Sequence, residues 1–221
     1  MGQTNETLLK SCADISTSTW SDAMDDLGIA GVVQGITPRG HQDRFAAFAV
    51  TARHLCGDFG DLDRADFAVG RLVEATGPGR ALMIDVGGAA ISTFGGIASM
   101  AASRRGATAV IIDGACRDVN EVKETGLWLA SRHVTPLTGK GRLKLISMGK
   151  PIMIGGVHVC EGDLVVGDDT GIIVVPRQRL EETLEVARQA LAVDLRVEQD
   201  IHNGSSFAEA AAAAGYIPAS R

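Results

Sequence analysis

The chain has 221 residues, of which 45% are hydrophobic and 22% charged, and its formal net charge is −6. This balance excludes a disordered chain, and the negative charge argues against a surface that binds nucleic acid directly. No apolar run reaches the roughly 18 residues that a membrane span requires, so we expect no contact with a membrane. The length fits a single domain over residues 1–221 with a sizeable core.

The first third of the chain carries two helix signals and one strand signal. Ser and Thr residues precede a predicted helix over residues 19–27, and an apolar run predicts a strand over residues 45–51. Helical spacing of apolar residues predicts a second helix over residues 63–76, which the Gly-Pro-Gly sequence at 77–79 ends.

The middle of the chain has the pattern of a strand, a helix and a second strand. Short apolar runs predict buried strands over residues 81–86 and 109–112, the latter closed by Asp113 and Gly114. Good helix formers between them predict a helix over residues 97–105. This alternation favours an α/β fold with parallel strands.

Two glycines, Gly95 and Gly96, stand where this central helix is expected to begin. Glycine allows a ligand to approach the free backbone N–H groups of a helix N-terminus, where the helix dipole favours a negative charge. The segment therefore predicts a site for a carboxylate or a phosphate.

Arg117 and Asp118 follow the second of these strands. Arginine offers a planar fork of donors to a carboxylate or a carbonyl oxygen, and aspartate offers the hard oxygen ligands that suit Mg²⁺, Mn²⁺ or another divalent ion. An ordinary ion pair in a surface turn is the alternative, and the dipeptide alone does not decide between them. Beside the predicted anion site, the pair favours the binding of a small oxo acid.

The second half of the chain is rich in short strand signals, with strands predicted over residues 144–146, 152–154, 157–159, 163–167 and 172–175. The Asp-Asp-Thr-Gly sequence at 168–171 lacks the remaining ligand spacing of a calcium loop and favours a tight turn. A long helix is predicted from Leu180 to about residue 202, with an apolar stripe suited to packing at a subunit interface. Residues 205–215 predict a short docking helix or a frayed end.

The four cysteines, Cys12, Cys56, Cys116 and Cys160, are widely separated and show no metal-binding spacing. We interpret them as reduced thiols, which predicts a cytoplasmic protein.

The order of these motifs resembles the RraA-like family, which includes the regulator of ribonuclease activity A and the class II 4-hydroxy-4-methyl-2-oxoglutarate aldolases. The resemblance rests on residues 16–24, on the Ile-Asp-Gly-Ala-Cys-Arg-Asp sequence at 112–118 and on residues 155–176. It implies a layered β/β/α swivelling sandwich of the phosphohistidine-domain-like kind. It also implies homotrimers or dimers of trimers.

The resemblance further implies a divalent-metal-dependent lyase that acts on a small 2-oxo acid and forms the enolate of pyruvate. Asp118 would be a metal ligand, and Arg117 would contact the keto acid and steady the enolate. The substrate would be bound by Arg117 and by a loop comprising Gly95, Gly96, Ile97 and Ala98.

Two positions bear on which reaction is expected. Family aldolases usually carry an acid where this chain has Gly96, and a second acid, usually glutamate, comes from the C-terminal helix of a neighbouring subunit. The position that matches this second acid is Asp194, whose shorter side chain would reach the metal through a water. Glu198, one helical turn later, is the reserve choice. Because a retro-aldol cleavage needs a base more than a decarboxylation does, we rank decarboxylation of an oxaloacetate-type acid at least level with aldol cleavage.

A function of another class stays open at this point. The resemblance also extends to regulators that bind a ribonuclease without catalysis, and an acidic chain suits a basic protein partner.

Overall fold

The fold is that of a computed structural model, which describes residues 5–40 and 43–216. Over these residues the helices are α1 (Asn5–Ala13), α2 (Thr17–Asp26), η1 (Arg64–Phe67), α3 (Val69–Ala75), α4 (Gly96–Arg104), α5 (Val119–Glu124), η2 (Arg177–Arg179), α6 (Leu180–His202) and α7 (Phe207–Ala214). The strands are β1 (Thr37–Pro38), β2 (Phe45–Cys56), β3 (Arg80–Asp85), β4 (Ser92–Phe94), β5 (Ala109–Cys116), β6 (Trp128–Val134), β7 (Leu143–Met148), β8 (Ile152–Ile154), β9 (Val157–Val159), β10 (Leu164–Gly167) and β11 (Ile172–Val175).

One curved sheet organises the molecule. Its strand order is β1-β6-β5-β3-β2-β10-β11, with β4 added beside β5 and β7 beside β2. The centre of the sheet is parallel, because β2, β3, β5 and β6 run in one direction. The two flanks are antiparallel. Parallel strands require crossover connections, and α4 and α5 supply two of them.

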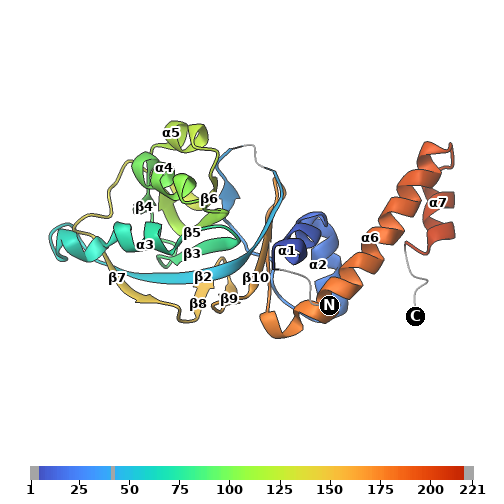
Figure 1. Ribbon diagram of the computed structural model, residues 1–221, viewed down its shortest axis with the longest axis horizontal. Helices are drawn as coiled ribbons and strands as arrows, with labels where there is room; N and C mark the ends of the chain where they lie inside the picture. The colour runs from blue at the N-terminus through green and yellow to red at the C-terminus, as the bar shows by residue number, and fades with distance from the viewer. Residues whose placement is uncertain (1–4, 41–42, 217–221) are drawn as a thin grey trace.

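Helices cover one face of the parallel strands, and a small hairpin covers the other. Helices α4 and α5 lie above β3 and β5, with α3 in contact with α4, whereas β8 and β9 lie below (Figure 1). The residues of β5 are buried along its whole length, which is the pattern of a central strand covered on both faces.

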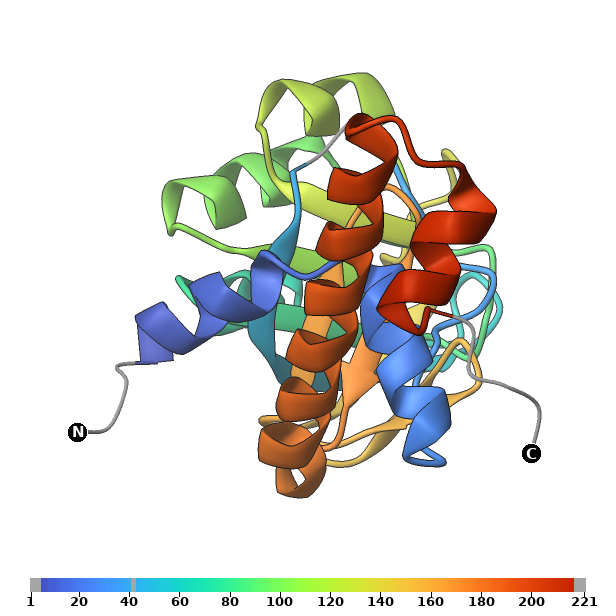
Figure 2. The same cartoon turned by 90° about the vertical axis from the view of Figure 1, so that its right-hand side faces the viewer.

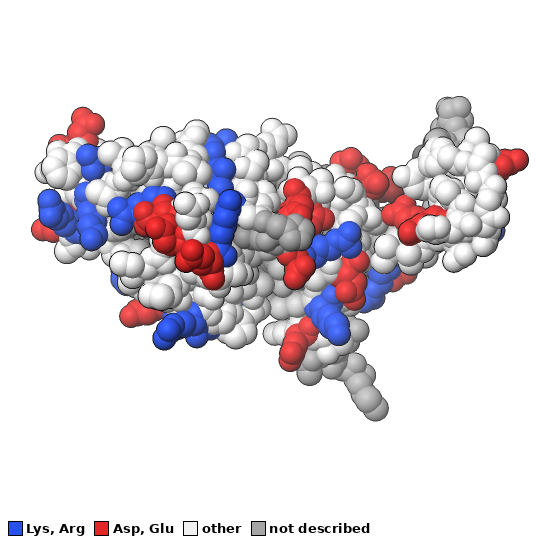
Figure 3. Space-filling view, turned by 90° about the horizontal axis from the view of Figure 1, so that it is seen from above, with Lys and Arg blue, Asp and Glu red and all other residues white. Residues whose placement is uncertain are grey.

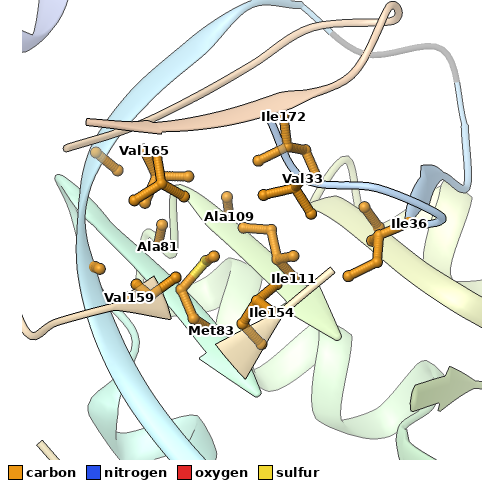
Figure 4. Close-up of a cluster of buried hydrophobic side chains, with 14 of the residues drawn as sticks. Val33, Ile36, Ala81, Met83, Ala109, Ile111, Ile154, Val159, Val165 and Ile172 are labelled. Carbon is orange, nitrogen blue, oxygen red and sulfur yellow. The ribbon is translucent and has the colours of Figure 1, made fainter. Parts of the chain in front are cut away.

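Two hydrophobic cores follow from this layering. The first lies between the sheet and the β8–β9 hairpin, where Met83 and Ile111 meet Ile154 and Val159 (Figure 4). The second lies under the helices, where Leu82 and Ile112 from the other face of the same strands are buried. Successive residues of a strand point to opposite faces, so β3 and β5 contribute to both cores.

A third core joins the antiparallel end of the sheet to α1, α2 and α6. Trp20 and Met24 of α2 are buried here with Val175 of β11 and Leu184 of α6. Helix α6 runs alongside α2 and continues away from the sheet to α7 (Figures 1 and 2). The end of this arm exposes Leu195, Ile201 and Phe207, which are 55%, 42% and 56% exposed.

The expected layered α/β fold is confirmed. Several elements differ from expectation. The strands predicted to end at residues 51 and 112 continue to Cys56 and Cys116, and the helix predicted over 63–76 is divided at Ala68, whose φ is 49°. Helix α1 and strand β6 were not expected at all.

No helix of the described residues is long and apolar enough to cross a membrane. All four cysteines are unpaired, as expected of reduced thiols, and Cys12 and Cys116 are buried.

Candidate functional site

The candidate site lies where β5 ends beside the start of α4. Strand β4 pairs with the end of β5, and the backbone N–H of Arg117 donates a hydrogen bond to the carbonyl oxygen of Phe94 at 3.0 Å. Since Phe94 is followed at once by Gly95, this bond fixes Arg117 next to the first turn of α4. The structure thus brings together the two motifs that the sequence singled out.

Asp118 has a left-handed backbone conformation, with φ 54° and ψ 46°. Aspartate and asparagine tolerate this region better than other residues with a side chain. The conformation turns the chain sharply out of β5 and into α5. It also directs the Asp118 carboxylate towards α4, where its Oδ2 accepts a hydrogen bond from the Gly96 N–H at 3.1 Å.

Arg117 and Asp118 form a partly exposed ion pair. Nε of Arg117 lies 3.4 Å from Oδ2 of Asp118, and the two side chains are 39% and 41% exposed. An exposed pair contributes little to stability, about 0–1 kcal/mol. Its guanidinium and carboxylate therefore stay available to a ligand at small energetic cost.

The two glycines are required by close approach. A Cβ atom on Gly95 would lie 2.5 Å from Oδ2 of Asp118 and 2.9 Å from Cγ of Arg117. A Cβ atom on Gly96 would lie 2.8 Å from Cβ of Glu121. Any side chain at either position would displace a neighbour, so both residues keep the backbone open at the start of α4.

The helix N-terminus differs in one respect from the predicted carboxylate site. The Gly96 N–H is already bonded to Asp118, so the protein supplies one anion of its own. The N–H groups of Ile97 and Ala98 lie in the first turn, where a helix offers no internal acceptor. These two groups are the ones that remain for a bound carboxylate.

Asp118 stands between two cavities. One, of about 420 Å³, lies between α3 and α4 and is lined by Arg117 and Asp118. The other, of about 730 Å³, lies between α4 and α5 and is lined by Asp118, Glu121 and Glu124. Glu121 and Glu124 are both exposed.

The residues at the site fit a hard divalent ion. Magnesium in proteins is held by one or two carboxylates together with water and substrate oxygens. Asp118 supplies an exposed carboxylate next to a substrate-sized cavity, and Glu121 brings a second acid to the same face of α5. No cluster of three or more metal-binding side chains occurs among the described residues, so any such site relies on this sparse form of coordination.

Asp194 and Glu198 lie far from Asp118 within one chain. Both belong to α6, at the end of the molecule opposite α4 and α5 (Figure 1). Asp194 accepts a hydrogen bond from the Thr19 hydroxyl at 3.1 Å, and Glu198 faces His202. Their predicted role requires a neighbouring subunit and stays a prediction.

The turn at 168–171 is confirmed as a tight turn with a capping carboxylate. Asp168 accepts hydrogen bonds from the Thr170 and Gly171 N–H groups and from the N–H and hydroxyl of Thr17 at the start of α2. Burial alone would raise the pKa of Asp168, but these hydrogen bonds outweigh it and hold the pKa below its ordinary value. The carboxylate thus fastens α2 to the sheet.

Sequence reasoning missed most of the wall of the cavity at Arg117. Phe67, Val69 and Val73 come from η1 and α3, Thr93 from β4, and Lys140 from the loop before β7. No motif marks these residues, because they are scattered over 74 positions of the chain, from 67 to 140. Only the fold brings them to one place.

A parallel sheet flanked by α4 and α5, with an Arg-Asp pair at the end of β5, defines the class of the protein. The sequence model described as RraA-like, Aldolase/RraA, matches residues 17–174, and the chain belongs to this family. Helices α6 and α7 lie beyond the matched region.

Solved structures with this fold include an uncharacterized protein from Pseudomonas syringae, with a TM-score of 0.82 and 27% identity over 93% of this chain and 96% of that one. Streptomyces coelicolor RraAS2, described as an unusual member of the RNase ES inhibitor RraA family, has a TM-score of 0.73 and 26% identity over 81% and 90% of the two chains.

Among curated relatives, the 4-hydroxy-4-methyl-2-oxoglutarate aldolase of Thermus thermophilus is 29% identical over 49% of this chain and 66% of its own length. A protein of Halalkalibacterium halodurans named "Putative 4-hydroxy-4-methyl-2-oxoglutarate aldolase" is 29% identical over 85% of both chains. Protein DlpA of Legionella pneumophila is 24% identical over 92% of this chain, which spans about a third of that protein (33%).

Proposed function

We propose that the chain is a divalent-metal-dependent carbon–carbon lyase that forms the enolate of pyruvate from a 2-oxo acid. The reaction is either decarboxylation of an oxaloacetate-type acid or retro-aldol cleavage of a 4-hydroxy-2-oxo acid. The observation that carries the proposal is the Arg117–Asp118 pair held at the open N-terminus of α4, beside a cavity of about 420 Å³. Relatives named as aldolases support the same class of reaction.

Each residue has a distinct task in this proposal. The N–H groups of Ile97 and Ala98 bind the carboxylate of the 2-oxo acid, since the helix dipole favours an anion there. The Arg117 guanidinium donates hydrogen bonds to the 2-oxo oxygen and stabilises the negative charge that develops on it. Asp118 would hold a divalent ion, which would supply Lewis-acid chemistry at the 2-oxo group.

The lack of a carboxylate at Gly96 does not by itself exclude aldol cleavage. The stem of Glu121 occupies the space next to it, with its Cβ 2.8 Å from where a Cβ of residue 96 would lie. An acid is therefore present on this side of Asp118, contributed by α5 instead of α4. Both reactions stay within the proposal.

Hydrogen exchange into pyruvate tests the proposal directly. When the protein is mixed with Mg²⁺ and pyruvate in D₂O, the methyl protons of pyruvate should be replaced by deuterium, which NMR measures. This exchange requires formation of the enolate but no cleavage of a carbon–carbon bond. Asp118→Ala should reduce exchange to the rate of Mg²⁺ alone. Release of pyruvate from oxaloacetate is measured in parallel, with Asp118→Ala as the control for decarboxylation by the free ion. Exchange equal in both proteins would refute the proposal.

A non-catalytic role as a regulator of a ribonuclease is the second candidate, favoured by the structural likeness to RraAS2. Acidic and basic side chains are interspersed over the face that carries α4 and α5, a mixture suited to protein contact (Figure 3). Inhibition of a purified ribonuclease that persists in Asp118→Asn would establish this role.

We propose further that the chain assembles as a homotrimer or a dimer of trimers, with α6 at the interface. The exposed apolar residues at the end of this arm support the proposal. Assembly would allow Asp194 or Glu198 to reach a neighbour's site. The protein would act in the cytoplasm.

A further inference from the structure

The cavity between α3 and α4 is the part of the site whose ligand the pyruvate chemistry does not explain. It extends from Arg117 and the start of α4 towards α3, and its volume of about 420 Å³ is in the range of small-molecule pockets. Pyruvate bound at Arg117 would leave much of this space to the rest of the substrate.

The wall of this cavity is mainly apolar. Its side chains come from η1, α3, β4 and α4, and they include Phe67, Val69, Val73, Phe94, Ala98 and Ala101. Phe67 and Phe94 are buried, whereas the valines and alanines are half-buried and keep part of their surface towards the cavity. Filling such a space with apolar atoms is favourable, because it removes apolar surface of both ligand and protein from water.

Charged side chains are confined to the exposed parts of the wall. Beyond Arg117 and Asp118, those that line the cavity are Glu74, Arg105 and Lys140, and all three are exposed. The Arg105 guanidinium is already bonded to the backbone oxygen of Glu74, at 3.0 Å. A carboxylate placed among the valines and phenylalanines would lose its hydration without gaining a charged partner, which disfavours its binding there.

One polar group on the inner wall lacks a partner. The Thr93 hydroxyl is buried and makes no hydrogen bond within the part of the chain that the structure describes. Thr93 precedes Phe94, whose carbonyl oxygen is bonded to Arg117, so this hydroxyl lies close to the reacting end of the cavity.

We propose that the substrate is a 4-hydroxy-2-oxo monoacid with an apolar alkyl or aryl group on C4, which occupies this cavity. The inference rests on the proposed lyase function and names the distal half of its substrate. In the cleavage, the C3–C4 bond breaks and its electron pair goes to C3, forming the enolate of pyruvate. The C4 hydroxyl loses its proton to water and becomes an aldehyde, and the enolate is protonated on C3.

The test compares two substrates that differ only on C4. The purified protein with Mg²⁺ is assayed for pyruvate release from 4-hydroxy-2-oxo-4-phenylbutanoate and from 4-hydroxy-2-oxoglutarate, which carries a carboxylate in place of the phenyl group. We expect kcat/KM to be at least about tenfold higher for the phenyl compound. A higher kcat/KM for the diacid, reduced by Lys140→Met, would overturn the inference and assign the exposed lysine to a second carboxylate.

A cavity-filling variant locates the effect. Ala101→Phe should lower kcat/KM for the phenyl compound by about 10- to 100-fold, because its ring takes the space of the substrate's own. The matched control is Ala30→Phe, an exposed loop position outside the cavity, which should leave kcat/KM unchanged. If Ala101→Phe does not fold, Val69→Phe makes the same test from the facing helix. Equal activity of a folded cavity variant and the control would overturn the inference.

Exchange of the pyruvate methyl protons separates this inference from the function on which it rests. Exchange that depends on Asp118, combined with preference for the diacid, would refute the apolar distal group alone. Absence of exchange would remove the lyase proposal and this inference with it.

Discussion

The contact between Gly96 and Glu121 can be tested with a pair of substitutions. Gly96 begins α4 and Glu121 lies in α5, and a Cβ atom on residue 96 would come within 2.8 Å of Cβ of Glu121. Gly96→Ala introduces that atom and nothing else. Because the contact is with Cβ, Glu121→Ala keeps the obstacle and only Glu121→Gly removes it.

The expected size follows from two opposing terms. Carbon atoms rest about 3.5–4.0 Å apart, so the two Cβ atoms would be about 1 Å too close, and overpacking of this kind costs about 1–3 kcal/mol. Alanine is favoured over glycine in a helix by at most about 1 kcal/mol. We expect Gly96→Ala to lower the free energy of unfolding by about 1 kcal/mol. It should also impair catalysis, because the Gly96 N–H would move away from the Asp118 carboxylate.

Urea unfolding of the single and double variants measures this coupling. The combination of Gly96→Ala with Glu121→Gly should be more stable than the sum of the single effects predicts, by about 1 kcal/mol or more. The combination with Glu121→Ala should show no such gain. Equal coupling in both pairs would refute the assignment of the clash to the Glu121 Cβ atom.

Four further predictions concern single residues. Asp118→Asn should abolish metal-dependent proton exchange and leave the midpoint of urea unfolding unchanged. Asparagine suits the same backbone conformation, and its amide oxygen can accept the hydrogen bond from the Gly96 N–H. A lowered midpoint would give Asp118 a structural role. Arg117→Lys should lower kcat by about 10- to 100-fold, less than the complete loss of an oxyanion donor, since an ammonium keeps the charge but cannot reproduce the guanidinium fork. Near-full turnover would show that charge alone matters. Burial lowers the pKa of His54 from 6.5 to about 4, so between these pH values His54 stays neutral in the folded protein while the unfolded chain takes up a proton. The free energy of unfolding should therefore fall by up to about 3 kcal/mol as the pH drops from 6.5 to 4. His54→Leu should flatten this part of the pH dependence, measured by urea unfolding. Asp168→Asn should cost about 2 kcal/mol in urea unfolding, because it weakens the bonds to Thr17, Thr170 and Gly171, and an unchanged midpoint would contradict the capping role.

The sequence predicted those elements whose signal is local. Strands β10 and β11 are short apolar runs bounded by turn residues, and both were found close to their expected limits. Strand β5 was predicted too short because Asp113 and Gly114 have the composition of a turn. Asp113 is instead held within the strand by Arg132, whose Nε donates to Oδ1 at 2.6 Å, and by the Gly155 N–H, which donates to Oδ2 at 2.7 Å.

The same division applies to the candidate site. The Arg117–Asp118 pair and the glycines of α4 could be predicted because they form a local motif and because the helix N-terminus has known chemistry. The hydrogen bond from the Gly96 N–H to Asp118 and the apolar wall that α3 contributes could not be predicted. Both depend on distances between segments that are remote in the chain, and periodicity carries no information about them.

The left-handed backbone at Asp118 restricts which sequences can occupy this position. Aspartate and asparagine tolerate that conformation better than other residues with a side chain, so asparagine is the polar replacement for Asp118 that the fold accepts most readily. Asparagine differs by the exchange of one oxygen for an NH₂ group and cannot serve as an anionic ligand. Under the proposed function, the single substitution Asp118→Asn would therefore remove the anionic metal ligand while it leaves the backbone conformation at this position unchanged.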